Sequence, residues 1–182
     1  MLFRSDLPLL YRSFGEGPGL IIVHGMMQLA DDQRKLAERL ATDFKVHLYD
    51  RSGFGDRNSY PFATDLAAEA LDLMRLLEVT GARHVMGVSV GGLICLSAML
   101  HGAPIEAAII FEPPLSHEGS VPVDWIPEMN DQLARGDRIG AMVSAMVGAQ
   151  MGPPFLARMP KWLLRLLTRV LVRAGGPNRS EE

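Results

Sequence analysis

The chain has one cysteine, few aromatic residues (7%) and little net charge. One cysteine excludes an internal disulfide, and a net charge of −3 gives no basic surface of the kind that binds nucleic acid. No apolar run reaches the ~18 residues that a membrane span needs. Arg4, Asp6 and Pro8 interrupt the N-terminal stretch, so we expect no secretory apolar segment there. We therefore expect a cytoplasmic protein with no membrane span and no nucleic-acid partner.

Metal-ligand patterns are also missing. The histidines and carboxylates show no spacing typical of a metal site, so we expect no metal. Cys95 lies among apolar residues, which favours a small buried side chain over a reactive nucleophile.

What the chain does have is 182 residues, 48% of them hydrophobic, which is enough for one globular domain with a core. Four apolar runs have the length of buried strands: residues 20–23, 45–49, 84–88 and 107–111. Helical periodicity is found in three stretches between them: residues 31–40, 64–79 and 91–100. An exposed strand is expected at 8–14. This alternation predicts an α/β fold with a mostly parallel sheet and helices on both faces.

The helix expected at 64–79 has recognisable ends. Thr64 is a candidate cap at its start, and Gly81 stops it. Its expected inward stripe consists of Leu66, Ala70, Leu73, Met74 and Leu77.

The pattern changes at Leu115, after which helical stretches follow without strands. We expect residues 1–118 to form the N-terminal part of a core and residues 119–182 a helical cap. The last helix, 161–173, has an apolar stripe beside a basic row: Lys161, Arg165, Arg169 and Arg173. That row is either the solvated outer face of a cap helix, which is the simpler interpretation, or a contact for an anionic membrane surface.

Polar or glycine-rich residues follow four of the predicted strands. They are the tripeptide His-Gly-Met at 24–26, the loop at 50–55, Ser89 and Glu112. In parallel sheets, ligands bind beyond the carboxyl ends of the strands. The convergence of four strand ends therefore predicts a functional site at that edge.

Ser89 is the centre of a G-x-S-x-G motif that joins the strand at 84–88 to the following helix. Gly87 and Gly91 have no Cβ, so the turn can be tight and the two elements can approach closely. Such a turn exposes the hydroxyl and aims the first N–H groups of the helix at developing negative charge. This pattern predicts a nucleophile elbow for acyl transfer, although a glycine-rich turn with an ordinary serine has the same letters.

Together these motifs resemble the α/β-hydrolase superfamily, specifically its lidded serine esterase and lipase-like members. The resemblance covers about residues 8–118 and rests on the motifs at 24–26, 50–55, 87–92 and 111–114, in the order and spacing of the family. It implies Ser89 as nucleophile and an oxyanion hole formed by the backbone N–H groups of Met26 and Val90. It also implies that His24 braces the oxyanion loop.

The resemblance also implies an acid and a histidine base, and the histidine follows the last strand in the family. That part is absent here, so we expect a C-terminally incomplete core. His84 and His101 lie roughly 15 Å and 18 Å from Ser89 along their elements. His47 is inside a strand, and His117 lies in a loop where it is either a base or a solvated side chain.

Glu112 is a tentative catalytic acid, because some members place the acid after this strand. It could equally cap a turn or pair with an arginine. For Asp50, Arg51 and Asp56 we expect charge-assisted hydrogen bonds that tie the glycine loop to neighbouring strand ends.

The sequence thus predicts a serine hydrolase that acts on small apolar carboxylic esters or acyl groups, without a cofactor, and impaired because the histidine region is absent. The alternative is a non-catalytic or fragment protein of the same fold that binds a ligand or partner. An open sheet edge could then pair with a second copy. A third possibility is that the chain is the leading part of a longer gene product.

Overall fold

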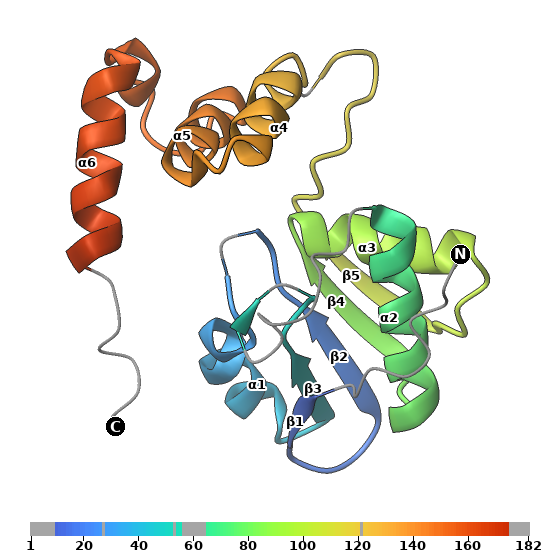
Figure 1. Ribbon diagram of the computed structural model, residues 1–182. Helices are drawn as coiled ribbons and strands as arrows, with labels where there is room; N and C mark the ends of the chain where they lie inside the picture. Colours follow the sequence, from blue (N-terminus) through green and yellow to red (C-terminus); the bar gives the residue numbers. More distant parts are fainter. Residues whose placement is uncertain (1–9, 27, 53, 56–64, 121, 175–182) are drawn as a thin grey trace. The chain divides into compact units, whose positions relative to one another are not determined.

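The computed structural model describes residues 10–26, 28–52, 54–55, 65–120 and 122–174 (Figure 1). The chain divides into two compact units, residues 1–114 and 115–182. The first unit holds the sheet with its helices, and the second is helical.

The first unit is built on a five-stranded sheet. Its strands are β1 (Tyr11–Phe14), β2 (Gly19–Val23), β3 (Lys45–Tyr49), β4 (His84–Val88) and β5 (Ala107–Phe111). They lie in the order β1-β3-β2-β4-β5. β1 runs antiparallel to β3, whereas the other three pairings are parallel. The expected mostly parallel sheet is therefore confirmed.

Helices cover both faces of this sheet (Figure 1). They are the short 3₁₀ helix η1 (Ala30–Gln33), α1 (Arg34–Leu40), α2 (Leu66–Thr80) and α3 (Val90–Leu100). One core cluster joins β2 and β4 to α2 and α3, with Ile21, Leu73 and Ile94 fully buried. The other joins β2 and β3 to η1 and α1, around Ile22 and Leu48. β2 contributes to both clusters, which is consistent with its continuous apolar run from Leu20 to Val23.

The ends and the face of α2 differ in part from the expectation. Asp65 is its N-cap, and its carboxylate accepts a hydrogen bond of 2.7 Å from the Ala68 N–H. Thr64, the expected cap, lies outside the described residues. Leu66 is exposed, while Leu76 is buried. The inward stripe therefore begins one turn later than expected and includes Leu76.

β5 forms one edge of the sheet. It pairs with β4 alone, and no described strand lies on its outer side. Ile109 and Phe111 are both exposed. Within the described residues the core thus ends at β5 with an open, apolar edge.

The second unit contains α4 (Ile126–Ala134), α5 (Arg138–Gly148), the 3₁₀ helix η3 (Leu156–Arg158) and α6 (Lys161–Ala174). α5 packs against both α4 and α6. Two ion pairs connect α6 to the other helices of this unit. Lys161 pairs with Glu128 on α4 at 2.8 Å, and Arg165 pairs with Asp137, the N-cap of α5, at 2.7 Å. None of the helices in the described ranges is long and apolar enough to cross a membrane.

Candidate active site

Ser89 lies on the turn between β4 and α3 with φ 52° and ψ −122°. A non-glycine residue in such a conformation stores about 1–3 kcal/mol of backbone strain, which the surrounding fold must hold in place. A Cβ at Gly87 would clash with the Gly91 carbonyl oxygen, and a Cβ at Gly91 would clash with that of Val23. The two glycines therefore let α3 approach the sheet and make the sharp turn possible.

Hydrogen bonds fix the backbone on each side of this serine. The Ser89 N–H donates to the Phe111 carbonyl at 2.9 Å, which extends the β4–β5 ladder to the turn. The Gly92 N–H donates to the Ser89 carbonyl at 2.8 Å. Val90 is the first residue of α3, where backbone N–H groups have no partner within the helix.

The loop after β2 lies directly beside the serine. An ideal Cβ on Gly25 would be 3.2 Å from the Ser89 Cβ and 3.2 Å from the Val88 carbonyl oxygen. The Gly25 N–H donates to the Gln28 side chain at 2.8 Å. The next residue, Met26, is exposed. The strand ends at residues 24–26 and at Ser89 therefore meet.

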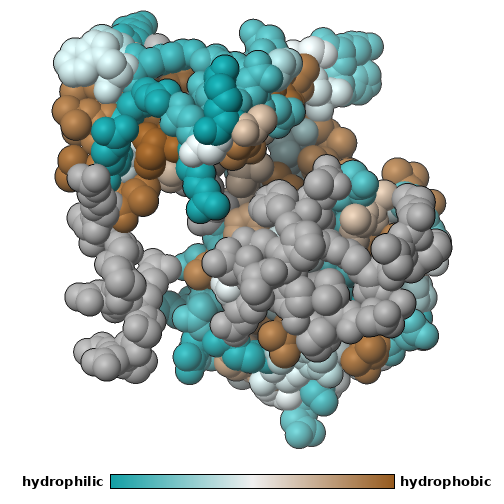
Figure 2. All heavy atoms as spheres, viewed as in Figure 1, coloured by the Kyte–Doolittle hydropathy of each residue, from teal (hydrophilic) through white to brown (hydrophobic). Residues whose placement is uncertain are grey.

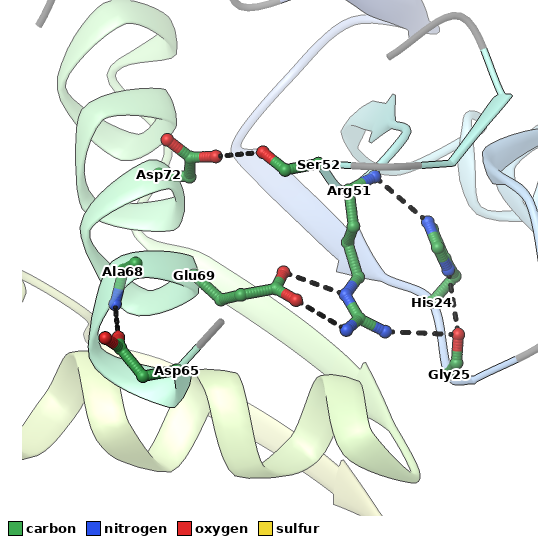
Figure 3. Close-up of polar contacts among 8 residues, drawn as sticks. All are labelled: His24, Gly25, Arg51, Ser52, Asp65, Ala68, Glu69 and Asp72. Carbon is green, nitrogen blue, oxygen red and sulfur yellow. Dashed lines mark hydrogen bonds and ion pairs between the residues drawn. The ribbon is translucent and has the colours of Figure 1, made fainter. Parts of the chain in front are cut away.

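His24 is buried and has both ring nitrogens engaged (Figure 3). Its Nε2 accepts from the Arg51 N–H at 3.2 Å, so the neutral ring carries its proton on Nδ1. That nitrogen donates to the Gly25 carbonyl at 2.9 Å. Burial is the main cause that lowers the pKa of His24, with the Arg51 charge adding to it and the Gly25 bond opposing it. The side chain is therefore a neutral brace of the loop.

Arg51 ties the same loop to α2 (Figure 3). Its guanidinium donates to both carboxylate oxygens of Glu69, at 2.6 Å and 2.9 Å, and to the Gly25 carbonyl at 3.3 Å. Only 4% of the Arg51 side chain and 7% of that of Glu69 are exposed. The guanidinium also lies 5.1 Å from the centre of the Phe54 ring. A second bond joins the loop to α2, from the Ser52 hydroxyl to Asp72 at 3.0 Å.

The tie expected of Arg51 is thus present, but its partner on α2, Glu69, is not among the residues predicted from the sequence. Glu69 and Asp72 are three residues apart and share a helix face with the buried Leu73 and Leu76. The sequence does hold a signal for these partners, because the two carboxylates have the same helical spacing as the apolar residues of the buried face. Asp50 accepts from the Ala30 N–H at 2.7 Å, whereas Asp56 lies outside the described residues.

Glu112 directly follows β5, next to the carbonyl that holds Ser89. Its φ is 46°, and its side chain is exposed rather than at a buried edge. The carboxylate is thus open to solvent at the end of the strand neighbouring the serine.

Four of the five histidines are bonded to groups other than Ser89. Besides His24, the ring of His47 bonds to Ser13 at 2.9 Å, that of His84 to the Gly19 carbonyl at 3.1 Å, and that of His101 to the Ser97 carbonyl at 2.7 Å. The fifth, His117, is exposed in the second unit. Within the described part of the first unit, no histidine is hydrogen-bonded to the Ser89 hydroxyl.

The fold and the site define the class of this protein. It is an α/β protein with a mostly parallel sheet and a serine on a strained strand-to-helix turn. The Alpha/beta hydrolase family model matches residues 20–180. The chain therefore belongs to the α/β hydrolase family. A crystal structure of an alpha/beta hydrolase from Sphaerobacter thermophilus is 31% identical with a TM-score of 0.70, and the match covers 91% of this chain and 68% of that one.

Two curated relatives each match about half of the chain. The pimeloyl-[acyl-carrier protein] methyl ester esterase of Vibrio atlanticus is 32% identical over 96 residues, and that of Chromobacterium violaceum is 36% identical over 87 residues. These matches cover 53% and 47% of this chain. They span only 36% and 33% of the esterases' own lengths, about a third.

Proposed function

We propose that this chain carries the nucleophile half of a serine esterase, with Ser89 as the attacking residue. The observation that carries the proposal is the strained φ of 52° at Ser89, held by two glycines next to the 24–26 loop. Strain of this kind persists where surrounding structure over-determines it, and it clusters at functional sites. The similarity to esterases supports carboxylic esters of apolar acyl groups as the substrate class.

The same loop supplies one donor of the proposed oxyanion hole. His24 and Arg51 both donate to the Gly25 carbonyl, so this oxygen is fixed toward the buried side of the loop. In a trans peptide the following N–H points the opposite way. The Met26 N–H is therefore aimed away from His24 and Arg51, and we propose that it serves the oxyanion.

Val90 supplies the second proposed donor. Its N–H is at the N-terminus of α3, where the helix carries partial positive charge. In the proposed reaction the Ser89 Oγ attacks the ester carbonyl and forms a C–O bond, and these two N–H groups bind the resulting oxyanion. Collapse breaks the bond to the alcohol, which leaves with the serine proton, and water then hydrolyses the acyl-serine.

Removal of the Ser89 hydroxyl proton is the step for which this chain has no assigned base. A serine hydroxyl needs a base that takes its proton and a group that orients the base. No described histidine of the first unit is bonded to Ser89, and Glu112 remains a proposed acid without an assigned base. We therefore propose that the chain reacts slowly, since loss of the base lowers rates by several orders of magnitude. Residues 119–182 remain a predicted cap.

A fluorophosphonate probe tests this proposal, because it labels activated serines covalently. We expect slow labelling of the full chain, located at Ser89 by mass spectrometry and lost in Ser89→Ala. Ser120→Ala, which removes an exposed hydroxyl elsewhere, should label as the unchanged chain does. Labelling at other serines, or none at Ser89 after prolonged exposure, would contradict the nucleophile. Rapid stoichiometric labelling would instead contradict the proposed impairment.

The open edge of β5 favours a second candidate, a non-catalytic protein that binds a partner strand. Unpaired backbone groups and exposed apolar side chains on an edge invite pairing with another chain, including a second copy. Light scattering coupled to size exclusion tests this candidate. A dimer that dissociates in Ile109→Lys would support it, and a monomer at high concentration would contradict self-pairing.

A further inference from the structure

The apolar face of α6 is largely uncovered. Among its most exposed side chains are Trp162, with 67% of its surface accessible, and Leu171, with 70%. Four further apolar residues on the helix are exposed as well: Leu166, Leu167, Val170 and Val172. Among residues 161–172, whose side chains the structure describes, only Leu164 and Thr168 are buried. The helix is thus attached through a narrow stripe, and hydrophobic atoms remain at its surface (Figure 2).

Positive charge is concentrated on the same helix. Basic residues recur at every fourth position: Lys161, Arg165, Arg169 and Arg173. Each is rotated by about 40° around the helix axis from the one before, so together they occupy an arc of about 120°. The sequence from 158 to 179 contains six basic and no acidic residues, in a chain whose net charge is −3. α6 is therefore a basic segment of an acidic protein.

The basic residues of α6 differ in their partners. Lys161 and Arg165 form ion pairs with Glu128 and Asp137, and the Lys161 pair is well exposed. Exposed ion pairs of this kind contribute little to stability, so the basic side chain can exchange its carboxylate partner for another anion. Arg169 is exposed and forms no ion pair with any described residue. Positive charge therefore remains available along the helix.

An apolar face beside a row of basic residues, with a tryptophan near their boundary, is typical of helices that lie in a lipid interface. α6 has 14 residues and is shorter than the ~20 residues of a spanning helix, so it would lie in the plane. We propose that α6 binds the surface of an anionic bilayer, with its leucines in the acyl boundary and its arginines at the lipid phosphates. An acidic protein would match the charges but leave the apolar face uncovered.

Binding of the full chain to vesicles tests the proposal. We expect cosedimentation with phosphatidylglycerol-containing vesicles, none with pure phosphatidylcholine vesicles, and weakening as salt rises. Trp125 and Trp162 are the two tryptophans, so in Trp125→Phe the emission reports Trp162 alone. That emission should shift to shorter wavelength with anionic vesicles, because the indole leaves water.

Matched variants distinguish the contribution of α6 to vesicle binding from that of the rest of the surface. Arg169→Glu and Leu171→Asp alter exposed side chains on α6, and each should weaken vesicle binding by about tenfold or more. Arg39→Glu on α1 and Val79→Asp on α2 likewise replace an exposed basic and an exposed apolar residue by an acidic one elsewhere, and should bind as the unchanged chain does. Circular dichroism confirms that each variant is folded.

Three results would overturn the proposal. They are no binding to anionic vesicles, equal binding by the α6 variants and their controls, or an unshifted Trp162 emission on bound vesicles. Capture of an acidic protein by α6 without vesicle binding would assign the surface to that class of partner instead. Ser89→Ala should bind vesicles normally, so failure of the esterase proposal leaves this test intact.

Discussion

The guanidinium of Arg51 and the carboxylate of Glu69 form a two-point ion pair within the first unit, with Nη2 2.6 Å from Oε1 and Nε 2.9 Å from Oε2. The pair connects the loop after β3 to α2. Through the third guanidinium nitrogen it also reaches the Gly25 carbonyl, and so the loop beside Ser89. One buried contact therefore links sheet, helix and candidate site.

Removal of one partner of this pair should destabilise the fold strongly. Glu69→Ala leaves the Arg51 cation buried without its carboxylate, and we expect a loss of about 3–5 kcal/mol in the free energy of unfolding. Urea denaturation measures the change. Glu38→Ala removes the exposed partner of Arg34 and should have little effect. Equal losses in the two variants would show that burial of the pair has no consequence for stability.

Arg51→Lys tests whether the pair also positions the proposed oxyanion loop. Lysine keeps the charge but cannot make the forked contact to Glu69 and reach the Gly25 carbonyl as well. We expect Ser89 to react about tenfold more slowly with the fluorophosphonate probe, a fraction of the effect of losing an oxyanion donor. Val46→Ala, on the opposite face of the sheet, serves as a destabilised control that leaves the loop untouched. If Val46→Ala slows labelling equally, the effect is one of stability and not of positioning.

The stability of the chain should fall as the pH is lowered from 7.5 to 5.5. Burial lowers the pKa of His24 and of His47, so the unfolded chain binds protons that the folded chain excludes. The stabilisation is complete above the unfolded value of about 6.5 and is lost as pH falls through the lowered folded values. Unfolding free energies across this range should decline less in the double variant His24→Asn, His47→Gln.

A control without a titrating group accompanies that measurement. Ser52→Ala removes a buried hydrogen bond to Asp72 and should lower stability without changing its pH slope between 7.5 and 5.5. If the double histidine variant keeps the wild-type slope, other groups cause the pH dependence.

Cys95 should be inert in the folded protein. It is fully buried, and burial raises the pKa of its thiol to about 12. The thiolate is the reactive form, so an aromatic disulfide reagent should react slowly in buffer and rapidly in denaturing urea. Rapid reaction without denaturant would show that α3 opens readily. Cys95→Ala, which has no thiol, is the negative control for this reaction.

Local sequence determined several elements of this protein. The strands expected at 45–49, 84–88 and 107–111 have those bounds in the structure, because short apolar runs flanked by turn residues leave few alternatives. The sharp turn at Ser89 was also predicted, since glycines two residues before and after it permit close approach. These features depend on neighbours within a few positions.

Only the tertiary structure decided how distant residues meet. Arg51 and Glu69 are 18 positions apart, and neither a motif nor a period couples them. The exposure of Leu66 and the burial of Leu76 depend on where α2 packs, which helical spacing alone leaves ambiguous by a turn. The strand order puts β5 at an edge and the 24–26 loop beside Ser89. Sequence thus fixes periodicity and local backbone freedom, whereas burial and charge pairing arise when separate segments share one core.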